Sequence, residues 1–322
     1  MYHFCTYFDR NYIAQGLTLY RSLSRNSGPF ILWVLCFDDP TYDLLMQMGI
    51  DNLRPVPLRD LEQGDGPLRK TKTDRSRVEY IFTCTPSWPL YLLNVHPEID
   101  MITYLDADLY FYSNPAPIFD ENTDRSILII GHRFPEHLRH LEIHGIYNVG
   151  LLTFRNDSRG RDCLQWWRER CLEWCFDRLE DGRYADQKYL DYWPERFPGV
   201  GVLQHKGAGL APWNFMKYKI DIEKTGVTID GQPLIFYHFH GFRLIYRLFY
   251  DPGTKLYGPM PSNLRRWLYD GYAKALFDTE TWVRNEIHLL KLVAYRPVSR
   301  SYPWWRMILN LLQGQISMIP KK

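Results

Sequence analysis

The chain has 322 residues, of which 45% are hydrophobic, and a formal net charge of +2. This composition excludes a disordered or fibrous chain and predicts a globular protein with a sizeable core, and the scattered cysteines favour reduced thiols over a disulfide framework. Because no apolar run approaches the ~18 residues of a membrane span and the first residues lack the basic start of a signal peptide, we expect a cytoplasmic protein.

Strand and helix patterns alternate at the start of the chain. Apolar runs at 2–8, 31–37 and 53–57 predict strands, and amphipathic stretches beginning near Ile13 and Thr41 predict helices between them. Strands that alternate with helices imply a doubly wound, mostly parallel sheet with flanking helices. The predicted fold class is therefore α/β and Rossmann-like.

The next part of the chain is less regular. Residues 58–77 are polar and contain several turn-forming residues, so we expect a loop there. Residues 78–93 have helical patterns at both ends, but Pro86 and Pro89 each lack a backbone donor. We therefore expect a broken helix.

Two carboxylates follow the apolar run 101–105 and are separated by a single residue. A buried strand would deliver Asp106 and Asp108 to the edge of the sheet, where ligands of open α/β folds bind. Hard oxygen donors suit Mg²⁺ or Mn²⁺ together with a diphosphate. One alternative is a pair of turn residues that cap the strand. Another is an aspartate phosphotransferase motif, which we rank lower because Tyr110 stands where Thr or Val is needed.

Four histidines lie between residues 132 and 144, at spacings that a helical metal site would allow. A solvated surface is the favoured interpretation, because acidic and basic residues are interspersed among them. The run 145–155 then predicts a buried strand with Asn148 as the polar side chain in its middle. A buried amide needs partners, so Asn148 is either a structural clamp or a ligand contact.

Helix and strand patterns continue to residue 276. An amphipathic helix is predicted at 158–179 with Ser158 as its cap, and Asp186-Gln187 opens the following helix. The remaining predictions are strands at 200–203 and 233–239, a glycine-rich loop at 205–214 and a helix at 262–276.

Residues 282–322 form a basic, aromatic tail. It contains seven Lys or Arg and one acidic residue, which leaves residues 1–281 with a net negative charge and argues against a nucleic-acid surface on the main body. Apolar residues recur at helical spacing, at Ile308, Leu309, Leu312, Ile316 and Ile319. An interfacial helix on a membrane surface is the favoured interpretation, and packing on the domain or a dimer contact is the alternative.

Five segments, in this order, resemble the motifs of the retaining, nucleotide-sugar-dependent glycosyltransferases of family 8, which include glycogenin and bacterial lipooligosaccharide galactosyltransferases. The resemblance covers residues 1–245. The segments are Thr6 with Asp9-Arg-Asn11-Tyr12, Tyr104-Leu-Asp-Ala-Asp108, Asn148-Val-Gly150, Asp186-Gln187 and His238-Phe-His240-Gly241.

The resemblance implies a GT-A catalytic domain at 1–281 and a divalent metal, Mn²⁺ or Mg²⁺, held by Asp106, Asp108 and His238, with His240 as the alternative imidazole. It implies a UDP-sugar donor and transfer of a hexose, with retention of configuration, to a glycan or lipid-linked acceptor. Asn148, Asp186 and Gln187 would face the transferred sugar. The implied donor contacts are Thr6, Asp9, Asn11, Tyr12, Asp106, Ala107, Asp108, Gly241 and Arg243.

Two departures from the family pattern affect the diphosphate. Arg243 stands where the family has a lysine after its His-x-x-Gly. The family's arginine ahead of the metal strand is missing, and either Arg77 or Lys72 is the candidate to replace it. The rival functions are a nucleotidyltransferase that makes the nucleotide sugar and a membrane-associated scaffold of the same fold without turnover.

Overall fold

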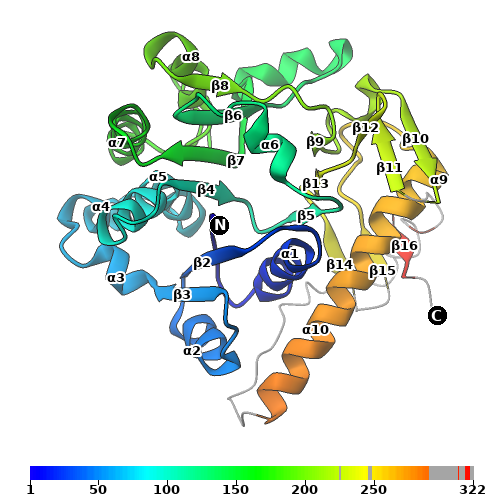
Figure 1. Ribbon diagram of the computed structural model, residues 1–322, viewed down its shortest axis with the longest axis horizontal. Coiled ribbons are helices and arrows are strands. Elements are labelled where there is room, and N and C mark those ends of the chain that lie inside the picture. Colours follow the sequence, from blue (N-terminus) through cyan, green and yellow to red (C-terminus); the bar gives the residue numbers. More distant parts are fainter. Residues whose placement is uncertain (225, 246–248, 290–310, 312–315, 320–322) are drawn as a thin grey trace.

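The computed structural model describes residues 1–289 apart from 225 and 246–248, and in addition residue 311 and residues 316–319. Its main feature is a seven-stranded sheet in the order β3-β2-β1-β4-β7-β6-β8 (Figure 1). Only β7 runs against its neighbours. The predicted mostly parallel α/β sheet is confirmed. The strands are β1 (Tyr2–Phe8), β2 (Phe30–Cys36), β3 (Leu53–Pro57), β4 (Met101–Leu105), β6 (Ile127–Gly131), β7 (Tyr147–Arg155) and β8 (Val200–Val202).

Helices cover both faces of this sheet because alternate strand residues point to opposite sides. Cys5 of β1 joins a core cluster with Trp88 and Trp167, whereas Phe4 joins a second cluster with Leu17 and Leu44. The first cluster lies under α5 and α7, and the second lies under α1 and α2. All six cysteines are free and buried, as expected for reduced thiols. These helices are α1 (Ile13–Asn26), α2 (Asp39–Met48), α5 (Arg77–Val95) and α7 (Ser158–Glu173).

The prediction of a loop at 58–77 is wrong. Two short helices, α3 (Leu58–Glu62) and α4 (Gly66–Lys70), and the 3₁₀ helix η1 (Thr71–Thr73) occupy it. The Asp65 carboxylate accepts a hydrogen bond from the backbone N–H of Leu68 and caps α4. Asp65 also pairs with Arg168 of α7 at 2.6 Å, so this segment is tied to the body of the protein.

The predicted break at Pro86 and Pro89 is also wrong, because α5 is a single helix. It begins with a capping box formed by Ser76 and Glu79. Both prolines are buried together with Trp88, whose indole N–H donates to the Thr6 carbonyl at 3.0 Å. Burial of this face against the sheet offsets the backbone hydrogen bonds that the prolines remove.

Helix α7 is shorter than predicted and is capped by a different residue. The Asp157 side chain, not Ser158, accepts from the Gly160 N–H at 2.8 Å. The helix ends at Glu173, where the Arg75 guanidinium donates to the carbonyls of Cys171 and Leu172 at 3.2 and 3.1 Å. This buried arginine therefore satisfies carbonyls that have no partner within the helix.

A small sheet, in the order β5-β13-β9, extends the molecule beyond β4. Its strands are β5 (Leu109–Phe111), β13 (Phe236–His238) and β9 (Ala208–Leu210). The glycine-rich segment predicted as a loop at 205–214 therefore contains a strand. A Cβ at Gly207 would lie 1.8 Å from the Pro233 carbonyl oxygen, so glycine permits this close approach of two backbones.

Smaller elements connect these layers. They are α6 (Ala116–Asp120), η2 (Glu136–His144), η3 (Lys188–Tyr192), α8 (Trp193–Arg196), η4 (Phe215–Lys217), β10 (Ile220–Glu223), β11 (Gly226–Ile229), β12 (Gln232–Pro233), β14 (Arg243–Ile245), β15 (Phe249–Asp251), α9 (Ser262–Arg265) and the π-helical turn η5 (Arg266–Asp270).

The C-terminal helix α10 (Gly271–Leu289) lies beside α1 (Figure 1). The domain boundary predicted between 281 and 282 falls inside it. Strand β16 (Ser317–Met318) pairs with β15, so the helix predicted to continue to Ile319 is wrong for these residues. Ile316 is buried. The predicted helical positions Ile308, Leu309 and Leu312 lie outside the described residues. No helix within the described ranges is long and apolar enough to cross a membrane.

Candidate metal and nucleotide-sugar site

The carboxyl ends of β1 and β4 form the edge where the candidate residues gather. These strands are parallel neighbours, with Cys5 opposite Tyr104. Asp9 directly follows β1, and Asp106 directly follows β4. Because adjacent strands are about 4.8 Å apart, the register brings the predicted nucleotide segment and the carboxylate pair to the same edge of the sheet.

Strand pairing brings His238 to the two carboxylates. β13 is antiparallel to β5, and His238 lies opposite Leu109, the residue after Asp108. The His238 Nε2 atom lies 3.1 Å from an Asp108 oxygen and 3.6 Å from an Asp106 oxygen. The side chain of His238 is 5% exposed, whereas the carboxylates are 29% and 25% exposed. The cluster therefore has a buried nitrogen and two oxygen groups that reach solvent.

Neighbouring groups hold this cluster in position. The Tyr104 hydroxyl donates to an Asp106 oxygen at 2.7 Å, and the Asp106 N–H donates to the Gly150 carbonyl at 3.0 Å. A Cβ at Gly150 would lie 2.9 Å from atoms of the His238 ring. Glycine at this position therefore leaves room for the imidazole.

The electrostatics of the three groups are interdependent. Burial raises the pKa of Asp106; the imidazole of His238 opposes this rise, and the charge of Asp108 adds to it. Burial acts in the same direction on Asp108, but the charge of His238 and its hydrogen bond outweigh it and lower that pKa. Burial would lower the pKa of His238, but the hydrogen bond to Asp108 and the two negative charges raise it. Positive charge between the carboxylates is therefore favourable.

His240 adds a second imidazole. Asp108, His238 and His240 each offer one ligand atom, and these atoms lie within 4.8 Å of one another. Burial and the charge of His238 lower the pKa of His240, which favours the neutral, ligating form. The ring of Trp213 packs edge-on against both imidazoles. The structure thus brings together both histidines that the sequence left as alternatives.

Arg77 reaches the predicted nucleotide segment. Its guanidinium donates to an Asp9 oxygen at 2.7 Å, and the backbone and side-chain N–H groups of Asn11 also donate to the Asp9 carboxylate. Asp9 is buried, so these hydrogen bonds hold the turn after β1. Of the two basic residues considered from the sequence, Arg77 therefore lies at this edge, whereas Lys72 pairs with Glu62.

Asn148 forms hydrogen bonds at both ends of its amide. Its oxygen accepts from the Gly150 N–H at 2.8 Å, and its nitrogen lies 3.2 Å from His132 Nε2. His132 is buried and its other ring nitrogen lies 3.3 Å from the Ile146 carbonyl. Burial lowers the pKa of His132 to about 3, so the ring is neutral and accepts from Asn148. His132 therefore lies in the core, where the sequence favoured a solvated surface.

Asp186 lies beneath the same edge. It is 5% exposed, and its backbone carbonyl accepts from the Trp167 indole at 2.8 Å. Burial raises the pKa of Asp186 to about 7, a hydrogen bond with Thr85 opposes the rise, and the charge of Asp106 adds to it. Gln187 donates to the His144 carbonyl at 3.1 Å. Thr85 and Tyr104 were not among the predicted site residues. Tyr104 could have been found, because it lies two residues before Asp106 on the same strand face.

The other predicted donor contacts have diverse surroundings. Thr6 is completely buried in β1, so it offers no surface to a ligand in this structure. Tyr12 is 52% exposed, Ala107 is half-buried between the aspartates, and Arg243 is exposed on β14. Gly241 has a φ of 75°, a left-handed conformation that favours glycine in the turn after β13.

Comparison with known proteins identifies close relatives. The uncharacterized protein YfnF of Bacillus subtilis (strain 168) is 35% identical over 250 residues, which cover 75% of this chain and 82% of YfnF. YfnD of the same organism is 33% identical over 281 residues, which cover 83% of this chain and 90% of YfnD. The chain belongs to the family of YfnF and YfnD. No family model matches the chain.

Among solved structures, the chain resembles the galactosyltransferase LgtC in complex with donor and acceptor sugar analogues. The TM-score is 0.54 at 15% identity, and the match covers 88% of this chain and 99% of LgtC. The chain has the GT-A fold, which confirms the fold expected from the sequence motifs.

Proposed function

We propose that the protein is a metal-dependent glycosyltransferase that moves a hexose from a UDP-sugar to a saccharide or lipid-linked acceptor and retains the configuration of the donor. The observation that carries the proposal is the convergence of Asp106, Asp108 and His238. Carboxylate oxygens of both aspartates lie within 3.6 Å of the His238 Nε2 atom, although Asp106 and His238 are 132 residues apart in sequence. Such a group at the strand ends of a GT-A fold matches the needs of a diphosphate leaving group.

The donor set fits a divalent cation. The carboxylates of Asp106 and Asp108 and one or two imidazoles are ligands that Mn²⁺ accepts, and the nitrogen donors favour Mn²⁺ over Mg²⁺. The raised pKa of Asp106 beside Asp108 is a second indication, because a cation would relieve the repulsion between the two carboxylates. When bound, the metal would act as a Lewis acid that stabilises negative charge on the diphosphate.

The nucleoside end of the donor fits the ends of β1 and β2. A cavity of about 340 Å³ lies there, lined in part by Arg10, Phe37 and Asp38. Arg10 donates to the Asp38 carboxylate at 2.9 Å. Asp9, which Arg77 holds in place, lies beside Arg10 in sequence. We assign Asp9, Asn11 and Tyr12 to contacts with the nucleoside, as the sequence motif implies, and Arg77 to orienting Asp9.

The sugar end of the donor belongs beside β7 and the turn before η3. In this proposal Asp186 and Gln187 hold the hexose and stabilise positive charge that develops at its anomeric carbon. The Asn148 amide donates one N–H to His132 and accepts from the Gly150 N–H. Its second N–H is therefore left to donate to a sugar hydroxyl. Arg243 would contact the diphosphate from the exposed start of β14.

The test is release of UDP. Purified protein is incubated with a panel of UDP-sugars and Mn²⁺, and slow hydrolysis to UDP is followed without an acceptor. We expect Asp108→Asn to reduce this rate at least 100-fold, because it removes a charged ligand from the metal. Asp43→Asn, an exposed change on α2, serves as the matched control and should retain the rate.

The result also separates the rival functions. Formation of a UDP-sugar from UTP and a sugar phosphate would indicate a nucleotidyltransferase, and would contradict the proposal. Failure to release UDP from every sugar, with Mn²⁺ or Mg²⁺, in protein that is folded by circular dichroism would favour the scaffold.

A further inference from the structure

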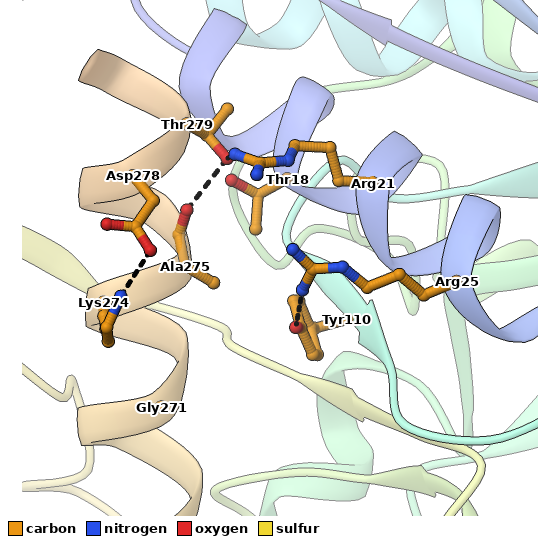
Figure 2. Close-up of a pocket in the computed structure, with 9 residues that line it drawn as sticks. All are labelled: Thr18, Arg21, Arg25, Tyr110, Gly271, Lys274, Ala275, Asp278 and Thr279. Atoms are coloured by element: carbon orange, nitrogen blue, oxygen red, sulfur yellow. Dashed lines mark hydrogen bonds and ion pairs between the residues drawn. The ribbon is translucent and has the colours of Figure 1, made fainter. Parts of the chain in front are cut away.

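A basic groove lies between α1 and α10 and contains none of the residues assigned above to the metal or the donor. Its volume is about 260 Å³. Figure 2 shows Arg21 and Arg25 extending from α1 toward α10, with Tyr110 of β5 at one end. Since one water occupies about 30 Å³ of liquid, the groove has room for a polyatomic ion or a small headgroup.

The charge of the groove is positive and only partly neutralised. Lys274 pairs with Asp278 at 2.5 Å. Arg21 and Arg25 instead donate to neutral hydroxyls, to Thr279 at 3.0 Å and to Tyr110 at 3.4 Å. Across the part of the chain that the structure describes, no carboxylate forms an ion pair with either guanidinium. Each guanidinium has five N–H donors, so most of them remain available to a ligand.

The groove is held open by its surroundings. The Thr279 hydroxyl donates to the Ala275 carbonyl at 2.8 Å, which fixes the acceptor that Arg21 uses. The Arg21 guanidinium also lies 5.7 Å from the centre of the Trp282 ring. Gly271 and Ala275 present little or no side chain to the groove. Arg21 is therefore preorganised, and a ligand that binds there loses little entropy in ordering it.

We propose that this groove binds a phosphate group, with Arg21 and Arg25 as its principal ligands. The planar guanidinium matches phosphate oxygens in paired, charge-assisted hydrogen bonds. The phosphate belongs either to a soluble phosphate ester or to the headgroup of an anionic lipid. Both sources share this chemistry, and a volume of about 260 Å³ excludes a complete nucleotide sugar. The inference does not depend on the proposed transferase activity.

The first experiment measures binding of inorganic phosphate and pyrophosphate by calorimetry, with EDTA present and no sugar donor. We expect binding to the full chain, and a loss of at least tenfold in affinity for the Arg21→Gln/Arg25→Gln double variant. Arg69→Gln removes the same charge from an exposed position on α4 and should bind like the unchanged protein. Equal binding by the double variant would overturn the proposal.

The second experiment distinguishes the two sources. Vesicles of phosphatidylcholine with and without phosphatidic acid are floated with each variant. The phosphate is assigned to a lipid if the protein floats with the phosphatidic acid vesicles, pyrophosphate abolishes this binding, and the double variant does not float with them. Phosphate binding without retention assigns it to a soluble ester. No binding in either experiment overturns the proposal. If the double variant melts well below the control, Arg25→Gln alone, at an exposed residue with one long hydrogen bond, replaces it.

Discussion

Asp186 shows how one buried carboxyl group links stability to pH. Its pKa is about 7 in the folded protein, well above the value of an unfolded aspartate, because burial disfavours the charge. The unfolded state therefore loses this proton first as pH rises. The resulting loss of stability is absent below about pH 4, grows until about pH 7 and is constant above that.

We therefore predict that Asp186→Asn stabilises the metal-free protein strongly at pH 8 and several-fold less at pH 4.5. The amide keeps the shape of the protonated carboxyl group, and the gain at pH 8 should be about 4 kcal/mol, or roughly 8 to 16 °C in melting temperature. Calorimetric melting in EDTA at the two pH values measures it. An equal shift at both pH values would show that burial of charge is not the cause.

His240 gives a second prediction at the scale of single residues. If both imidazoles bind the metal, His240→Ala should weaken Mn²⁺ binding about tenfold and Mg²⁺ binding less, because Mg²⁺ prefers oxygen ligands. His238→Ala should abolish Mn²⁺ binding. Titration followed by electron paramagnetic resonance measures free Mn²⁺ directly. His137→Ala, an exposed histidine on η2, is the control, and unchanged affinity in His240→Ala would exclude that residue as a ligand.

The sequence predicted which residues meet but not how they are supported. Asp106 and Asp108 could be selected because polar residues directly after an apolar strand point to a sheet edge, whereas His238 was indicated by the resemblance of its segment to a family motif. The hydrogen bond from Arg77 to Asp9 and the pairing of His132 with Asn148 depend on contacts between distant segments. Local patterns hold no information on such contacts, so His132 resembled its exposed neighbours.

At the scale of secondary structure, tertiary contacts decide where helices end. Two predictions were wrong for this reason. Helix α5 continues through Pro86 and Pro89, where a break was predicted, and short helices replace the loop predicted at 58–77. Propensity is a weak signal that burial overrides. The strands of the seven-stranded sheet were predicted well, because β-branched and apolar runs such as 2–8 and 101–105 are both locally favourable and buried.

Arg75 tests this dependence. Its guanidinium is 1% exposed, donates to the last carbonyls of α7 and lies 4.6 Å from the centre of the Phe176 ring. We expect Arg75→Ala to lower the free energy of unfolding by about 2–4 kcal/mol, since buried carbonyls would lose their donor. Urea denaturation measures the loss. Arg69→Ala should change stability by less than about 0.5 kcal/mol, and a similar small effect for Arg75→Ala would contradict the capping role.

At the scale of the whole molecule, the described residues on both sides of the predicted boundary contact the same domain. The predicted boundary at 281/282 cuts α10 in two. Val283 is completely buried in the cluster that contains Leu17 of α1, and the buried Ile316 precedes the strand that pairs with β15. The sequence could not reveal these contacts, because a basic aromatic tail has the same composition whether it binds a membrane or returns to its own domain.

Truncation separates these two roles. A chain that ends at residue 281 loses Val283 and Trp282, whereas a chain that ends at 289 keeps both and lacks the strand at 317–318. We expect the shorter chain to melt far lower or to aggregate, because truncation opens the α1 face of the core, at about 25 cal/mol for each Å² of apolar surface exposed. The longer chain should be moderately destabilised. Equal melting temperatures for both truncated chains and the full chain would contradict this expectation. In that case α10 would contribute nothing to the core beyond residue 281, and the tail would be a separate unit, as its composition indicated.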